Sequence, residues 1–399
     1  MILLLHPFGN ANVRAVLSAL DREDRLAKFF TTLGWSNGSP LLQALPEKLR
    51  AEMKRRGYEV PHYKIRTQPG RETVRLLAEK FGLRALTKHE TGWASIDQVW
   101  SSMDKRAAAY LRNNQERLCI DGVYAYEDCA LHSFEIAHEL GVRRIYDLPI
   151  AYWETAQRLL RAEAERWPDW EPTLGGTRDS TEKLARKTRE LELAELVVCP
   201  SAFVLDSLPA ETRMSKKCVV APFGSPQINT TDTSRADCSP LRVLFAGALT
   251  QRKGLADLFA AMKLVNSREV ELLVMGSLVL PMEFYRSQFP NFIYEGPRAH
   301  DAVLRLMSSC HVLVLPSIVE GRALVQQEAL ACGLPLIVTR NAGGEDLIVE
   351  GETGFLVPPG EPAAIAEKIQ WFVENRAKLP GMSAAARAKA AELTWPAYG

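Results

Sequence analysis

The sequence predicts an α/β protein with two domains, each built on a parallel β-sheet that helices cover on both faces. The chain has 399 residues, and single hydrophobic cores stop growing at about 250–300 residues. In the second half, short apolar runs that end at glycine alternate with segments of helical apolar spacing. A stretch rich in proline and threonine, without periodicity, separates the halves and is typical of a linker.

The second half shows the alternation most clearly. Residues 241–246 form an apolar run that ends at Gly247, and residues 254–266 carry apolar side chains at helical spacing. Runs of this length are typical of buried parallel strands. The pattern continues as predicted strands 270–275, 291–295, 311–316 and 334–338 and as predicted helices 281–289, 299–309 and 323–332. This repetition predicts a doubly wound sheet.

The first half is also α/β but less regular. Its predicted strands are 2–5, 119–125, 143–148, 195–199 and 217–221, and its predicted helices are 11–21, 128–140 and 201–208, with two charged helices between 151 and 193. Helical segments at 36–56 and 93–112 have no clear place in this pattern. We place a first domain at 1–222, a linker at 223–240 and a second domain at 241–399, whose last helix can return to the first domain.

The composition excludes several classes of protein. Charged residues make up 24% of the chain and the formal net charge is +1, so no global field would attract nucleic acid. The seven cysteines are scattered and form no CxxC pair, which indicates reduced core residues. The apolar residues 1–5 are too few for a signal peptide or a spanning helix. We therefore expect a cytoplasmic protein.

A cationic loop follows the first strand of the second half. The segment Gly247-Ala-Leu-Thr-Gln-Arg252-Lys253-Gly254 leads from strand 241–246 into a helix. Glycine lets the backbone approach a phosphate closely, while arginine and lysine supply positive charge. Two basic residues at the start of a helix are also common on solvated faces. On its own the loop therefore fits both phosphate binding and solvent exposure.

Two acids, Glu320 and Glu328, follow strand 311–316. A helix that starts near Ala323 would direct its first N–H groups toward an anion. At ~1.5 Å per helical residue, the two carboxylates would be separated by roughly 10 Å. That spacing suits two groups that flank a diphosphate, one at a sugar and one at a ribose, and it is too wide for a shared proton. A surface glutamate and an unrelated helix glutamate are the competing interpretation.

Residues 316–335, from Pro316-Ser-Ile-Val-Glu320 to Gly333-Leu-Pro335, resemble the E-x7-E element of glycosyltransferase family 4, the retaining enzymes of the GT-B fold. The likeness includes the Arg252-Lys253-Gly254 loop and covers roughly 241–375. It implies two Rossmann-like domains that face each other across a cleft. It also implies transfer of a sugar, with retention, from a UDP- or GDP-linked donor to a carbohydrate or glycolipid acceptor, in polysaccharide or glycolipid biosynthesis.

The resemblance implies roles for the residues that match. Arg252 and Lys253 would hold the donor diphosphate and stabilise the leaving group. Glu320 would lie beside the hydroxyls of the donor sugar, and Glu328 would bind the ribose. Further donor contacts are implied at Gly9, Asn10, Gly247, Arg298, Arg322, Ala323 and Leu324. Because two cations serve the diphosphate, the resemblance implies no metal and no other cofactor.

Several positions depart from the family pattern. Arg322 would contact an anionic sugar or lipid phosphate, or would face solvent. Asp147 stands where the family often has a histidine near the donor sugar, and it is either a sugar contact of the first domain or a turn cap before Pro149. The loop at Gly9 has one glycine instead of a pair. The chain ends at 395–399, short of the usual final helix, so we expect reduced interdomain anchoring or a shortened sequence.

Two other functions stay open at this point. A GT-B-fold epimerase of nucleotide sugars would share the diphosphate site but take acid and base residues from both domains, and a non-catalytic nucleotide-sugar-binding protein would keep the fold. The basic stretch 48–56 would give peripheral contact with the inner face of a membrane, or is simply solvated. His6 and His132 are interpreted as structural. The motifs do not specify the donor sugar, base, acceptor, linkage or oligomeric state.

Overall fold

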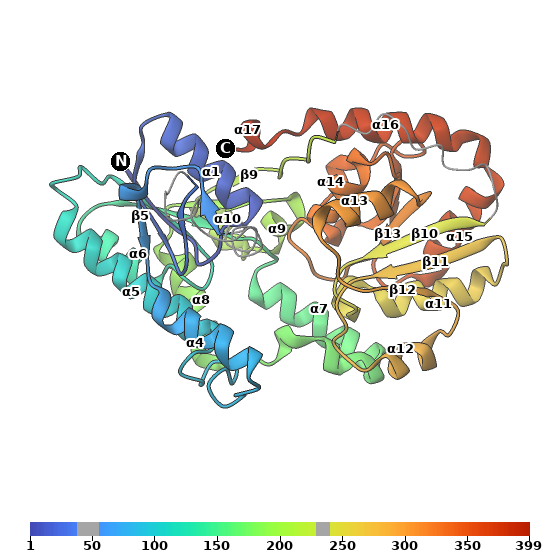
Figure 1. Cartoon of the computed structure of the whole chain (residues 1–399), viewed down its shortest axis with the longest axis horizontal. Helices are drawn as coiled ribbons and strands as arrows, with labels where there is room; N and C mark the ends of the chain where they lie inside the picture. Colours follow the sequence, from blue (N-terminus) through green and yellow to red (C-terminus); the bar gives the residue numbers. More distant parts are fainter. Residues whose placement is uncertain (38–55, 229–239) are drawn as a thin grey trace.

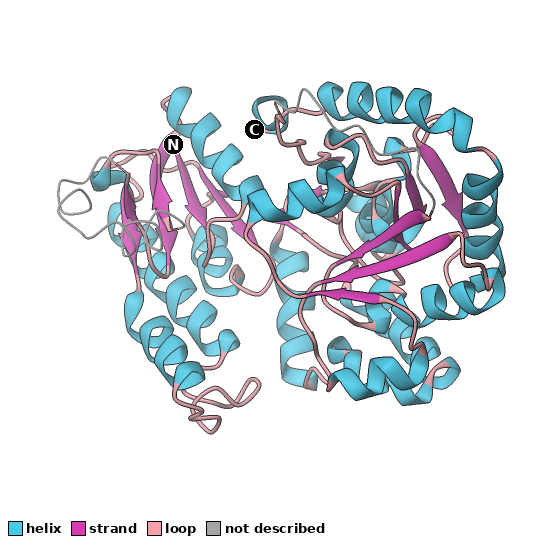
Figure 2. Cartoon of the chain, turned by 45° about the vertical axis from the view of Figure 1, so that its right-hand side comes forward, coloured by secondary structure: helices cyan, strands magenta, loops and turns pink. Residues whose placement is uncertain are grey.

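The computed structural model describes residues 1–37, 56–228 and 240–399. It contains two parallel sheets, one in the first half of the chain and one in the second, each with helices around it (Figures 1 and 2). The first sheet has the strand order β5-β2-β1-β6-β7-β8-β9, and the second has the order β12-β11-β10-β13-β14-β15. Both sheets are doubly wound, so the fold class predicted from the sequence is confirmed.

The first sheet confirms the predicted strands of the first half and adds two. Its strands are β1 (Ile2–Leu5), β2 (Leu26–Thr31), β5 (Ile65–Thr67), β6 (Gly122–Tyr126), β7 (Arg143–Asp147), β8 (Leu196–Cys199) and β9 (Lys217–Val220). A separate pair is formed by β3 (Trp35–Ser36) and β4 (Gly57–Tyr58). The sequence interpretation missed β2, because Lys28 interrupts its apolar run, and β5, because it has only three residues.

Helices cover the first sheet in the positions that its crossover connections require. They are α1 (Ala11–Arg22), α4 (Pro69–Lys80), α5 (Ile96–Asn114), α6 (Leu131–Glu139), α7 (Trp153–Arg166), α8 (Thr181–Leu193), α9 (Ala202–Ser207) and α10 (Ala210–Ser215). The helical segment predicted at 93–112 is α5, which packs against α6 and α4. The other unplaced segment, 36–56, lies mostly outside the described residues.

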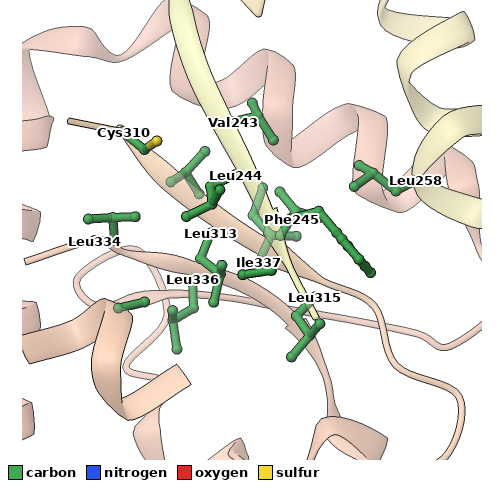
Figure 3. Close-up of a cluster of buried hydrophobic side chains, with 14 of the residues drawn as sticks. Val243, Leu244, Phe245, Leu258, Cys310, Leu313, Leu315, Leu334, Leu336 and Ile337 are labelled. Carbon is green, nitrogen blue, oxygen red and sulfur yellow. The ribbon is translucent and has the colours of Figure 1, made fainter. Parts of the chain in front are cut away.

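The second sheet confirms the predicted strands and helices of the second half. Its strands are β10 (Leu241–Ala246), β11 (Val270–Met275), β12 (Ile293–Glu295), β13 (Val312–Leu315), β14 (Leu336–Thr339) and β15 (Gly354–Val357). Its helices are α11 (Leu255–Val265), α12 (Met282–Gln288), α13 (His300–Ser308), α14 (Leu324–Ala331), α15 (Pro362–Glu374), α16 (Leu379–Glu392) and α17 (Trp395–Tyr398). Figure 3 shows why the runs are apolar: side chains of β10, β13 and β14 interdigitate in one buried cluster.

The end of the chain returns to the first half. From α16, α17 reaches α1 and packs against it (Figure 1). The ring centroids of Trp395 and Tyr398 lie 6.2 and 5.5 Å from that of Phe223, in the segment that connects the two sheets. The last helix therefore returns to the first half, and its aromatic rings bridge the two halves.

Two expectations from composition concern the described residues only. No helix among them is both long and apolar enough to cross a membrane. Of the six cysteines that the structure describes, four are buried, which agrees with their interpretation as core residues.

Candidate functional site

A cleft of about 770 Å³ lies between the two halves and is lined by both of them. Loops after β1, β7, β10, β11, β12 and β13 open into it, as expected for a ligand site at the carboxyl ends of parallel strands. Most of the side chains that the sequence singled out meet here. The predicted residues in its lining are Asn10, Gly247, Lys253, Arg298, Glu320, Arg322, Ala323, Leu324 and Glu328.

The first half contributes a wall that the sequence interpretation largely missed. It consists mainly of aromatic and amide side chains: His6, Phe8, Asn10, Asn12, Trp100 and Tyr126. Tyr126 ends β6, so its place at the carboxyl end of a strand was a usable signal. Trp100 lies inside α5, where no local pattern distinguishes a cleft residue from a core residue.

The cationic loop and the first acid form one ion cluster. Arg252 Nη1 lies 2.9 Å from Glu320 Oε1, and Lys253 Nζ lies 2.5 Å from Glu320 Oε2. Burial of Glu320 opposes its ionisation, but the two cations outweigh that effect and hold its pKa below the ordinary glutamate value. Glu320 is therefore a carboxylate with both oxygens engaged, and Arg252 lies directly behind the cleft lining.

Gly247 shapes the approach of Lys253 to this cluster. Its φ of 150° lies outside the range that side chains usually adopt, and a Cβ there would lie 2.7 Å from Lys253 Cδ. The lysine stem therefore crosses the bare backbone of Gly247. The close neighbour of Gly247 in the structure is Lys253 itself, and the approach of a phosphate to this backbone stays a prediction.

The second acid lies on the helix that points its N-terminus at the cleft. Ala323 precedes α14, and Ala323 and Leu324 line the cleft together with Glu328. The first N–H groups of a helix have no partner within it and favour an anion. Burial raises the pKa of Glu328, and His300, whose Nδ1 lies 3.5 Å from Glu328 Oε1, opposes that rise. An anion-binding helix end and a carboxylate thus share one side of the cleft.

Arg322 differs from the expectation that its side chain faces solvent. Its side chain is completely buried, with Nη1 2.6 Å from Asp346 Oδ1 and Nη2 3.0 Å from Asp346 Oδ2. Nη1 also donates to the carbonyl of Gly343. The expectation of a solvated side chain is wrong, and the charge offered for an anion is already paired. The fork of Arg322 instead ties the 343–346 turn to the loop that carries Glu320.

Removing Asp346 tests this structural role. We expect Asp346→Ala to lower the free energy of unfolding by about 1–3 kcal/mol, because a buried guanidinium would lose its partner. Urea denaturation followed by tryptophan fluorescence measures the change. Glu352, an exposed acid of the same half, provides the control, and a Glu352→Ala variant of equal instability would contradict the assignment.

Two other predicted contacts do not line the cleft. Asp147 is 1% exposed and accepts a hydrogen bond of 2.7 Å from the hydroxyl of Tyr124. Burial raises the pKa of Asp147 to about 7, against the effect of the neighbouring tyrosine hydroxyls. Neither the sugar contact nor the turn cap describes Asp147, which lies beneath the cleft wall. Gly9 faces the ring of Tyr58 instead of the cleft.

His6 is a cleft residue although the sequence favoured a structural role. Its Nδ1 accepts a hydrogen bond of 2.9 Å from the backbone N–H of Phe8. Its ring packs edge to face against that of Tyr126, with the two ring centroids 4.6 Å apart. Burial lowers the pKa of His6 to about 3, so the imidazole is neutral at physiological pH. The structure thus supports the structural role and adds a place in the cleft wall.

The two halves touch at the loop that carries Glu320. A Cβ at Gly321 would overlap the carbonyl oxygen of Pro149. The hydroxyl of Ser201 donates a hydrogen bond of 2.6 Å to the carbonyl of Gly321. The side-chain amide of Gln251, which precedes Arg252 in the sequence, donates a hydrogen bond of 2.6 Å to Glu163 on α7. The first half therefore contacts both loops of the ion cluster directly.

Potential metal ligands in the described residues do not belong to the cleft. His89, Glu90 and Asp179 form one such group in the first half. Asp179 Oδ1 lies 3.0 Å from Lys183 Nζ and 3.2 Å from His89 Nε2. The ion pair of Asp179 with Lys183 and its hydrogen bond with His89 hold these side chains together.

The second half of the chain is similar to known proteins. Residues 240–375 match the family model described as glycosyl transferases group 1. The capsular polysaccharide biosynthesis glycosyltransferase CapM of Staphylococcus aureus is 33% identical over 138 residues, which cover 33% of this chain and 36% of that protein. An uncharacterized glycosyltransferase of Methanocaldococcus jannaschii is 31% identical over 134 residues, which cover 33% of this chain and 38% of that protein. The chain thus matches less than two fifths of the length of each of these relatives.

Solved structures extend the likeness to the whole fold. Sucrose-phosphate synthase from Thermosynechococcus elongatus has a TM-score of 0.67 at 18% identity, with 100% of this chain and 96% of that chain covered. HepE from Anabaena, in complex with UDP, has a TM-score of 0.61 at 17% identity, with 99% and 96% covered. The chain therefore has the GT-B fold. Within this fold, residues 240–375 are the segment that is similar to glycosyl transferases group 1.

Proposed function

We propose that this chain is a retaining glycosyltransferase of family 4 that transfers a sugar from a UDP- or GDP-linked donor to a hydroxyl of a carbohydrate or glycolipid acceptor. The ion cluster of Arg252, Lys253 and Glu320, beside the N-terminus of α14, carries this proposal. HepE of Anabaena, which shares the fold, has been solved with UDP-glucose, and this supports a uridine nucleotide. The name of CapM supports a role in polysaccharide biosynthesis.

The proposed roles follow from charge and position. A donor diphosphate in the cleft would share Arg252 and Lys253 with Glu320, and the first N–H groups of α14 would bind its remaining oxygens. Glu328, when ionised, would accept hydrogen bonds from the ribose hydroxyls. Arg298, at the same end of the cleft, would border the base. Because two cations and a helix N-terminus would face the diphosphate, we propose that transfer needs no metal.

We propose front-face attack by the acceptor hydroxyl. The bond from the anomeric carbon to the phosphate oxygen breaks as the bond to the acceptor oxygen forms on the same face. The departing phosphate oxygen takes the acceptor proton, and Arg252 and Lys253 stabilise the charge that develops on it. Glu320 is an unsuitable nucleophile because both of its oxygens face cations. His6, neutral and packed in the cleft wall, would line the acceptor side.

Protection against thermal unfolding by a panel of nucleotides and nucleotide sugars tests the proposal. We expect UDP or GDP and one matching sugar conjugate to raise the melting temperature, since a ligand at 100 times its Kd stabilises the folded state by about 2.7 kcal/mol. The protective conjugate is then incubated with candidate acceptors, and NMR of the product reports its anomeric configuration. Absence of protection by every nucleoside diphosphate would favour a different function.

Product analysis without an acceptor separates the proposed transferase from a nucleotide-sugar epimerase. An epimerase would need acid and base groups from both halves. Among the described residues, the titratable side chains that the first half places in the cleft lining are His6 and Tyr126, and burial disfavours the charged form of each. We therefore expect no epimer to form. An epimerised nucleotide sugar in the acceptor-free reaction would contradict the proposal.

The ionisation of Glu328 should make nucleotide affinity depend on pH. Because burial raises its pKa, Glu328 takes up a proton at a higher pH than an ordinary glutamate, and the carboxylate that accepts ribose hydrogen bonds is lost as the pH falls. We expect the Kd for the nucleotide to rise between pH 7 and pH 5. At pH 7, Glu328→Gln should weaken binding by about 10- to 100-fold and show a flatter pH profile. Titration calorimetry measures both effects, and Glu283→Gln, at an exposed acid of α12, should match the parent protein.

A further inference from the structure

Large apolar side chains gather on the exposed end of the first half where α4 leads into α5. Phe81 is 68% exposed, and Leu83 and Trp93 are each 51% exposed. The set consists of Leu76, Leu77, Phe81, Leu83, Trp93 and Ile96. We call residues 76–96 the α4–α5 tip. In Figure 1 this segment projects below the rest of the first half.

Hydrogen bonds hold the α4–α5 tip as one compact unit. Leu83 N donates to Ala78 O and Ala94 N donates to Leu86 O, each at 2.8 Å. Arg71, on the first turn of α4, bonds to the carbonyl of Trp93 and lies 4.7 Å from the centre of its indole ring. The apolar side chains are therefore presented by an ordered surface, where a hydrophobic patch is costly unless it has a partner.

The charges of the α4–α5 tip are unbalanced toward positive. Lys80, Arg84 and Lys88 are exposed and make no ion pair with any residue that the structure describes. The acids nearby are matched within the protein. Glu79 pairs with Arg75 at 2.6 Å, and Glu90 accepts a hydrogen bond of 2.9 Å from the backbone of Ser180. The combination selects a partner that is both apolar and negatively charged.

We propose that the α4–α5 tip docks the protein on an anionic membrane surface. The apolar side chains would enter the boundary between headgroups and acyl chains, and the three cations would meet anionic headgroups. Trp93, with its amphipathic indole, suits the headgroup level. This surface is distinct from the stretch 48–56, which lies, apart from Arg56, outside the described residues. Arg56 itself pairs with the buried Glu72 at 3.2 Å.

The α4–α5 tip connects directly to the cleft wall of the first half. Trp100, one helical turn beyond Ile96 on α5, lines the cleft. The guanidinium of Arg75 lies 6.0 Å from the centre of the Phe8 ring, another part of that wall. Docking would thus bring the acceptor side of the cleft close to the membrane, which suits a glycolipid acceptor. This last step rests on the proposed glycosyltransferase function, whereas membrane docking does not.

Co-sedimentation with vesicles tests the docking surface. Vesicles of equal parts phosphatidylcholine and phosphatidylglycerol are compared with vesicles of phosphatidylcholine alone, at two salt concentrations. We expect binding to the anionic vesicles that weakens with salt, and a loss of at least about tenfold for Phe81→Ser/Leu83→Ser. Met214→Ser/Leu264→Ser, at residues 87% and 61% exposed elsewhere on the surface, is the matched control and should bind like the parent protein.

The triple variant Lys80→Gln/Arg84→Gln/Lys88→Gln separates the contribution of charge to vesicle binding from that of the apolar side chains. At about fivefold per cation near the surface, this variant should bind anionic vesicles roughly 100-fold more weakly and neutral vesicles unchanged. Equal losses in the control pair, or no binding of the parent protein to anionic vesicles, would overturn the proposal. So would a change in molar mass by light scattering for Phe81→Ser/Leu83→Ser, since the patch would then join two copies of the chain. Thermal protection by nucleotide, measured on every variant, reports the proposed function independently.

Discussion

Lys253→Ala should reduce kcat/KM for sugar transfer by about 10²–10³-fold, the usual effect of losing one preorganised charge contact to a leaving group. Lys253 Nζ lines the cleft and lies 2.5 Å from Glu320. Its loss would remove positive charge from the departing phosphate and would leave Glu320 with Arg252 as its single cationic partner. The pKa of Glu320 would then rise toward the ordinary value. Initial rates of product formation at several donor concentrations measure the effect.

Two further variants make that result interpretable. Lys253→Arg retains the charge but places a planar fork where the pocket holds a point donor, so we expect an intermediate rate. Lys263→Ala, at an exposed lysine of α11 in the same half, should leave transfer unchanged. If a folded Lys253→Ala variant kept near-normal kcat/KM, the result would contradict a catalytic role for the ion cluster.

Gly321→Ala should separate transfer from donor binding. A Cβ at this position would overlap the carbonyl oxygen of Pro149 in the first half, and the neighbours that must yield are backbone atoms. The added methyl would push the loop that carries Glu320 away from the first half, while α14 and the ion cluster lie within the second half. We expect kcat/KM to fall by about 10²-fold, because a displacement of about 1 Å between reacting groups has that cost.

The nucleotide affinity of Gly321→Ala shows whether the substitution impairs transfer alone or also donor binding. The Kd for the nucleoside diphosphate should change by less than about threefold, because the second half supplies the proposed phosphate contacts. Gly381→Ala is the matched control: a Cβ there meets nothing within 4 Å, so both activity and affinity should be retained. Equal losses of transfer and of nucleotide affinity in Gly321→Ala would show instead that the substitution damages the donor side itself.

The sequence by itself determined most of the second half. Strands buried on both faces must be continuously apolar, so β10, β11, β13 and β14 were visible as apolar runs. The carboxyl ends of parallel strands share one edge of a sheet, so the sequence predicts that Lys253, Glu320 and Glu328 lie near each other. The first inference depends on residues close together in the chain. The second depends on the topology of a parallel sheet, which brings Lys253 and Glu320 together although they are 67 positions apart.

Only the tertiary structure decided the other side of the cleft and the state of several charges. Trp100 lies inside a helix and reaches the cleft through the packing of α5. Arg322 is buried because Asp346, 24 positions away, neutralises it, and Asp147 lies beneath the cleft wall because Tyr124 binds it from a neighbouring strand. Burial and ionisation depend on partners brought together by folding, so a local pattern identifies the chemical group but not its environment.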